Sequence, residues 1–239
     1  MPAGFLGELF GTMVLILLGD GVVAAVLLNK SKAQNAGWIV ITAGWAFAVM
    51  CGAFVSAAFG GPGSLNPAGI IQGWFAAGAD IGNGVMLIVA QFLGAMLGAL
   101  LVWLAYLPHW EITEDKGAKL GVFSTGPAIR NPVANLITEI IGTFSLIFIV
   151  SAIGKAVSGA TPGLNTYLVG MLIWSLGLSL GGPTGYALNP ARDLGPRIMH
   201  AILPIAGKGS SDWEYAWIPV VGPIIGAVLG GVLFRALAG

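Results

Sequence analysis

The stretch GSLNPAGIIQG, residues 63–73, shares a Leu-Asn-Pro-Ala core with YALNPARDLGP, residues 186–196. Proline costs little in the first turn of a helix, because its missing N–H would have no helical partner there, and asparagine is a good N-cap before it. Each copy therefore predicts a helix that starts at the proline. The apolar segments that follow are only about 10–14 residues long, which is typical of re-entrant or interfacial segments and too short for a full crossing of a bilayer.

The composition of the chain indicates a membrane protein. Of its 239 residues, 56% are hydrophobic and 8% are charged, whereas a soluble domain carries about 25% charged residues. The net charge is zero and no basic run occurs, which excludes the electrostatic pattern of a nucleic-acid binder. The single cysteine, Cys51, excludes an internal disulfide and is expected to pack as a small apolar residue. Six stretches are long and apolar enough to span a bilayer: about 5–28, 36–58, 82–106, 133–154, 165–181 and 214–237.

The two halves of the chain resemble each other. GELFGTMVLILLG from Gly7 matches TEIIGTFSLIFIV from Thr138, and LGAMLG at 93–98 matches VGPIIG at 221–226. Three spans and one half-span thus occur twice, and an odd number of crossings per repeat makes the second copy enter the membrane from the opposite side. We expect one domain over 1–239, with repeat one at about 1–107, a polar connecting loop at about 108–130 and repeat two at about 131–239.

An inverted repeat brings the two predicted helix starts together near the middle of the membrane. Irregular backbone at that depth is tolerated only where it is buried or lines a watery cavity, so the arrangement predicts a pore or a central binding site. Each helix N-terminus carries about half a positive elementary charge, and two of them at one constriction repel cations, protons included. The amides of Asn66 and Asn189 can donate hydrogen bonds to a passing hydroxyl or water.

On these features the chain resembles the aquaporin superfamily, the major intrinsic proteins, over nearly its whole length. The resemblance implies an all-α membrane protein with six transmembrane helices and two re-entrant half-helices in an inverted repeat. It also implies a homotetramer with one pore per subunit, a plasma-membrane location and two cytoplasmic termini. In this orientation most lysines lie outside the cell, although the positive-inside rule expects them in cytoplasmic loops. We nevertheless expect the orientation that the family implies. Features typical of the glycerol facilitators, or aquaglyceroporins, define the subgroup: Asp193, Arg197 and the pair Pro219-Val220.

The resemblance also assigns roles to individual positions. The implied selectivity filter consists of Trp45, Gly177, Tyr186 and Arg192. The implied constriction consists of Asn66, Pro67, Ala68, Asn189, Pro190 and Ala191. The implied acceptor carbonyls along the path belong to Gly63, Ser64, Gly185, Tyr186 and Ala187. The acids that match those bracing the re-entrant loops are Glu8 and Glu139. No metal and no cofactor is expected.

Two departures from the family pattern bear on the solute. Tyr186 stands where facilitators usually have phenylalanine, and Ser64 stands where the family usually has histidine. They motivate the hypothesis that the pore also passes protonated lactic acid, which is neutral and about the size of glycerol.

We therefore predict a passive channel for small neutral solutes, namely glycerol and similar polyols, water and protonated lactic acid, that excludes ions and protons. The alternatives are a lactic acid channel as the main role, a water-selective aquaporin and, less favoured, an ion-coupled secondary transporter. Asp20 has no partner in the repeat, and the sequence gives no account of it beyond a place in a wall or vestibule. An enzyme is not expected, because His109 and His200 show no metal-ligand spacing and are interpreted as solvated or interfacial.

Overall fold

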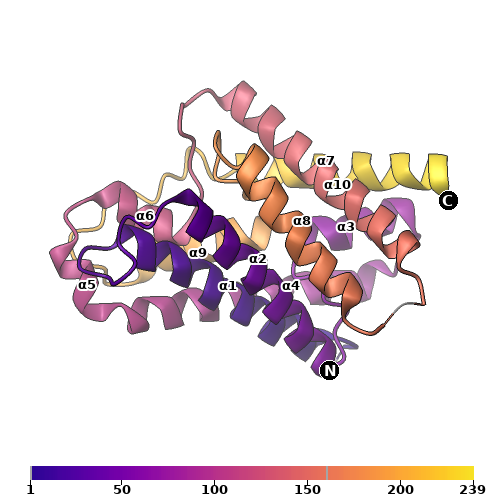
Figure 1. The fold of residues 1–239 in the computed structure, drawn as a ribbon, viewed down its shortest axis with the longest axis horizontal. Coiled ribbons are helices and arrows are strands. Elements are labelled where there is room, and N and C mark those ends of the chain that lie inside the picture. Colours follow the sequence, from indigo (N-terminus) through magenta and orange to yellow (C-terminus); the bar gives the residue numbers. More distant parts are fainter. Residues whose placement is uncertain (1, 160) are drawn as a thin grey trace.

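The computed structural model describes residues 2–159 and 161–239, and every regular element in these two ranges is a helix (Figure 1). The five longest helices have 21 to 25 residues: α1 (Phe5–Leu27), α2 (Trp38–Ala58), α4 (Ile81–Ala105), α7 (Pro132–Ala156) and α10 (Ile218–Ala238). Four further helices are shorter: α3 (Pro67–Ala76), α6 (Lys116–Phe123), α8 (Leu164–Leu180) and α9 (Pro190–Ile202). The six-residue helix α5 (Leu107–Ile112) directly follows α4.

All six predicted spans correspond to helices. Five of them are long and apolar enough to cross a membrane by length and composition, and α8, an apolar helix of 17 residues, is at the short limit for a spanning helix. The expected polar loop at 108–130 contains α6 and most of α5, which gather at the end of the molecule opposite to the C-terminus (Figure 1). The last span starts at Ile218 rather than near 214, because residues 213–217 form turns.

The helices pack in a pattern that repeats between the two halves. α1 packs against α2 and α4, and α7 packs against α8 and α10. The short helices cross between the halves, because α3 lies against α10 and α9 lies against α4. Each half-helix is therefore supported by a long helix of the other repeat, α3 by α10 and α9 by α4.

Glycines set the register of the closest helix pairs, and they correct one detail of the sequence comparison. A Cβ at Gly94 would meet the carbonyl of Leu9, and a Cβ at Gly226 would meet that of Ile140, the repeat counterpart of Leu9. Backbones that approach this closely require a small residue. The match of 93–98 with 221–226 is therefore one helical turn out of register, because Gly94 corresponds to Gly226 and not to Gly222.

Apolar side chains dominate the outer faces of the long helices, and several charged side chains are buried in the interior. Large side chains such as Phe47, Phe54 and Leu229 are exposed, whereas Glu8 and Glu139 are completely buried. Cys51 is also exposed, so the expectation that it packs inside the protein was wrong. In a bilayer an apolar residue is stable on the outer face too, and apolarity alone does not predict burial.

Candidate functional site

The two Leu-Asn-Pro-Ala copies start α3 and α9 in the way that their local chemistry predicts. The side-chain oxygen of Asn66 accepts a hydrogen bond from the N–H of Ala68 at 2.9 Å. The side-chain oxygen of Asn189 accepts from the N–H groups of Ala191 at 3.0 Å and Arg192 at 3.2 Å. Both asparagines are therefore N-caps, with the proline at the first helical position.

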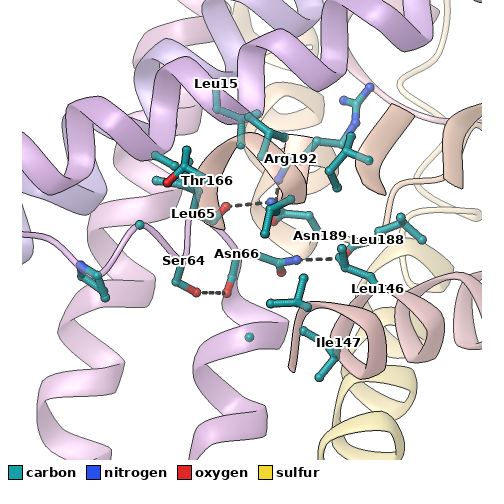
Figure 2. A pocket seen from close by; sticks show the side chains of 18 of the residues that line it. Leu15, Ser64, Leu65, Asn66, Leu146, Ile147, Thr166, Leu188, Asn189 and Arg192 are labelled. Carbon is teal, nitrogen blue, oxygen red and sulfur yellow. Dashed lines mark hydrogen bonds between the residues drawn. The ribbon is translucent and has the colours of Figure 1, made fainter. Parts of the chain in front are cut away.

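The same two asparagines connect the two repeats. The Asn66 amide donates to the carbonyl of Leu188 at 2.8 Å, and the Asn189 amide donates to the carbonyl of Leu65 at 2.7 Å. Figure 2 shows these bonds as two dashed lines between the loops, in the middle of the pocket. A side-chain amide has two N–H donors, so each asparagine uses one N–H for the opposite loop and keeps a second for another acceptor.

A buried carboxylate supports each loop from behind. Glu8 accepts from the N–H groups of Ser64 at 3.1 Å and Leu65 at 2.7 Å. Glu139 accepts from the N–H groups of Ala187 and Leu188, both at 3.0 Å. Leu65 and Leu188 have φ values of 51° and 52°, a conformation that a side chain makes unfavourable unless the surroundings hold it. The carboxylates therefore fix strained backbone directly before each asparagine.

Further partners of these carboxylates were not found by sequence reasoning. Ser56 and Gln91 donate to Glu8 at 2.9 and 2.6 Å, and Thr184 donates to Glu139 at 2.7 Å. Ser56 and Thr184 precede their respective asparagines by ten and five residues, so no common spacing links them. Only a search for polar residues inside apolar helices could have selected Gln91.

A cavity of about 410 Å³ passes the two asparagines. It follows one face of α2 for three helical turns, about 16–18 Å, along Trp45, Val49, Ala53 and Ala57. Its apolar wall comes from α1, α2, α7 and α8, and its polar groups come mainly from the motif loops and from Gln72, Asn165 and Thr166. Of the predicted acceptor positions, Gly63, Ser64, Tyr186 and Ala187 line the cavity, whereas Gly185 does not.

Three of the four predicted filter residues meet at one end of this cavity. The guanidinium of Arg192 lies 3.9 Å from the centre of the Trp45 ring, which is a close cation–π contact. Tyr186 lines the same end, and its hydroxyl is buried without a hydrogen-bond partner among the described residues. Gly177 does not line the cavity, but a Cβ there would lie 2.8 Å from the Tyr186 ring, so the glycine leaves the space that the ring occupies.

Asp20 lies behind this end of the cavity. It is completely buried, and its Oδ1 is 3.4 Å from Nη1 of Arg192. The expectation of a wall or vestibule acid was therefore wrong, because Asp20 does not line the cavity and instead faces the arginine that does. The two residues are 172 positions apart in the sequence.

A second buried ion pair fastens the connecting segment to α9. Arg197 donates to Asp193 at 2.8 Å and to the carbonyl of Thr125 at 2.8 Å. Asp193 in turn accepts from the backbone N–H of Thr125 at 2.7 Å. The carboxylate and the guanidinium are thus both used in holding the chain after α6 against the helix that carries Arg192.

The histidines occupy structural positions. His109 contacts the carbonyl of Asn29 at 2.8 Å, and His200 contacts the Ser211 hydroxyl at 2.8 Å. His200 is completely buried, so its interpretation as solvated or interfacial was wrong. Within residues 2–159 and 161–239, no cluster of three metal-ligating side chains occurs.

The paired half-helices, the crossed asparagine bonds and the cavity between them define a membrane channel of the aquaporin type. The major intrinsic protein family model matches residues 3–234, and the chain belongs to that family. It is a multi-pass membrane protein of a family of channels and not an enzyme.

Individual relatives are similar over most of their length. Glycerol uptake facilitator protein 3 of Lactiplantibacillus plantarum is 55% identical over 97% of this chain and 95% of its own. The glycerol uptake facilitator protein of Bacillus subtilis is 52% identical over 97% of this chain and 84% of its own. Among solved structures, the aquaglyceroporin from Plasmodium falciparum superimposes with a TM-score of 0.86 and 29% identity, over 98% of this chain and 95% of the other.

Proposed function

We propose that this protein is a passive channel for glycerol and similar small polyols, together with water, and that it excludes ions and protons. The observation that carries the proposal is the mixed lining of the cavity. Apolar side chains such as Leu15, Val49 and Ile173 line it together with side-chain amides and the two motif loops. A polyol has the same mixed character, because its hydroxyls can bind hydrogen-bonding groups while its carbon chain contacts apolar side chains.

The names of the relatives support the same solute class, since several are glycerol uptake facilitators. The two half-helix N-termini beside Asn66 and Asn189 add positive potential at the centre of the path. This potential does not oppose the passage of a neutral solute, but it raises the energy barrier for a cation or a proton.

The assembly and orientation that we propose follow the family. The chain forms a homotetramer in the plasma membrane, with one pore in each subunit. Its six spans are an even number, which places both termini on one side of the membrane, and we assign that side to the cytoplasm. Protease accessibility of a tag at the C-terminus in sealed right-side-out vesicles tests the orientation, and a protected tag is expected.

The test of the channel function is stopped-flow light scattering on proteoliposomes that contain the purified protein. We expect the glycerol permeability to exceed that of empty liposomes by at least about tenfold, with the low temperature dependence of a channel and no response to ion gradients. Glycerol entry at the rate of empty liposomes, with measurable water entry, would favour a water-selective aquaporin instead.

Protonated lactic acid is a second candidate solute, favoured by one observation. The buried Tyr186 hydroxyl has no hydrogen-bond partner among the described residues, and it lies at the same end of the cavity as Arg192. Together they could bind the hydroxyl and the carboxylic acid of a small hydroxy acid. Lactic acid uptake into the same proteoliposomes should rise as the external pH falls, because the neutral form becomes more abundant. Uptake that is independent of pH contradicts this candidate.

A further inference from the structure

Asp20 is a buried acid that the repeat does not explain. In the register that pairs Glu8 with Glu139, the position of Asp20 is occupied by Ser151 in the second repeat. In the register that pairs the two asparagines, the position of Arg192 is occupied by Gly69 in the first repeat. Asp20 and Arg192 therefore both break the symmetry of the fold, and they break it at the point where they meet.

The contact holds the arginine by one side of its guanidinium. Nη1 of Arg192 lies 3.4 Å from Oδ1 of Asp20 and 3.3 Å from the carbonyl of Phe123, while the plane of the group lies over Trp45. In the part of the chain that the structure describes, no hydrogen bond engages Nε or Nη2 of Arg192. Nη1 thus anchors the side chain, whereas the N–H groups of Nε and Nη2 can donate to a solute.

α1 also supports the tryptophan on which the arginine stacks. Gly19, directly before Asp20, lies so close to the Trp45 ring that a Cβ at this position would overlap it. Neighbouring residues of one helix therefore place the ring and supply the counter-charge. This arrangement ties the position of Arg192 to α1 and not only to its own helix α9.

The pair also changes the charge at the constriction. The Asp20 side chain is fully buried and that of Arg192 is 7% exposed. A buried charge is costly unless it is paired, and the loss of one partner is much more damaging than the loss of both. Together the two side chains carry no net charge, so Arg192 adds little to the positive potential of the half-helix termini.

We propose that Asp20 is a positioning residue for Arg192: it holds the guanidinium against Trp45, at the edge of the lumen, and compensates its charge. This inference rests on the proposed channel function. Without Asp20, the guanidinium loses an anchor, can lean into the lumen and carries its full charge. Without Arg192, the carboxylate is left as an unpaired negative group beside the path, where it favours the entry of cations.

The experiment is a double-variant cycle in proteoliposomes, with Asp20→Asn, Arg192→Val and the combination of both. Glycerol and water permeabilities are measured by stopped flow. Proton leak is followed with an encapsulated pH-sensitive dye while potassium and valinomycin set the membrane potential. Ser151→Ala, at the repeat counterpart of Asp20, is the control for a polar change at the same depth, and the yield of folded protein is followed by size exclusion in detergent.

We expect Asp20→Asn to lower the ratio of glycerol to water permeability by about five- to tenfold, and Arg192→Val to raise proton leak by about tenfold. The double variant should show a leak well below that of Arg192→Val alone, and Ser151→Ala should match the wild type. If a single variant does not fold, recovery of folded protein in the double variant shows the same coupling.

The inference is overturned if the effects of the two substitutions are additive. It is also overturned if the double variant improves neither the proton leak nor the yield of folded protein over the single variants. A wild-type protein that conducts neither glycerol nor water defeats the proposed function instead, so the two failures are distinguishable.

Discussion

The two re-entrant loops share a Leu-Asn-Pro-Ala core and differ in the residues around it. In each core the leucine has a positive φ and is held by a buried glutamate, and the asparagine caps its helix and donates a hydrogen bond to the other loop. After the core, the first loop continues with Gly69 and Ile70, whereas the second continues with Arg192 and Asp193. The shared part fixes the backbone of the path. The differing part adds the charged groups that can discriminate between solutes.

The shared part should be sensitive to the same change in both repeats. Glu8→Ala and Glu139→Ala each leave several buried donors without an acceptor, at about 1–3 kcal/mol for each donor. We expect each variant to lose several kcal/mol of stability and to yield little folded protein. Thermal unfolding in detergent, followed by circular dichroism, measures this loss. If one of the two variants melts like the wild type, the loops are not supported in the same way.

The second repeat should depend in addition on its own ion pair. Arg197→Met leaves Asp193 buried without its cationic partner, and breaking a buried pair costs about 3–5 kcal/mol. Arg130 is a matched control, because it pairs with Asp212 at 2.5 Å while half of its side chain is exposed. Arg130→Met should cost less than about 1 kcal/mol, since exposed pairs contribute little. Equal melting temperatures for the two variants would contradict the structural role of Asp193 and Arg197.

Structural features that depend on neighbouring residues could be predicted from the sequence, whereas contacts between distant residues could not. The capping by Asn66 and Asn189 follows from the residues next to them, and the half-helices were predicted correctly for that reason. The register of Gly94 could not be predicted, because glycines four residues apart allow a match that is shifted by one turn. The contact of Asp20 with Arg192 depends on how α1 and α9 meet, and no local pattern encodes it.

Filter geometry can be altered at Gly177 without touching a charge. A methyl group at this position would lie 2.8 Å from the Tyr186 ring and 2.8 Å from the side chain of Thr42. Gly177→Ala should therefore push the ring toward the lumen. We expect glycerol permeability to fall about tenfold, equivalent to about 1.4 kcal/mol, with a smaller change for water, which needs less width. Stopped-flow permeabilities of both solutes measure the ratio, and Gly182→Ala, which has open space around its Cβ, is the control.

The smallest expected change concerns the Tyr186 hydroxyl. Tyr186→Phe removes one oxygen that has no hydrogen-bond partner among the described residues and leaves the ring in place. The melting temperature should therefore stay close to that of the wild type. A hydrogen bond from this hydroxyl to a solute would contribute about 0.5–1.5 kcal/mol, so the permeability of a solute that uses it should fall by a factor of about 2–12.

Permeabilities of water, glycerol and lactic acid, measured side by side, separate the possible outcomes. A fall for lactic acid alone supports the second candidate solute. A fall for glycerol as well makes the hydroxyl a general part of the filter. If all three ratios stay unchanged, Tyr186 does not act on the solute through its hydroxyl, and the difference between the two loops then rests on Arg192 and its partner Asp20 alone.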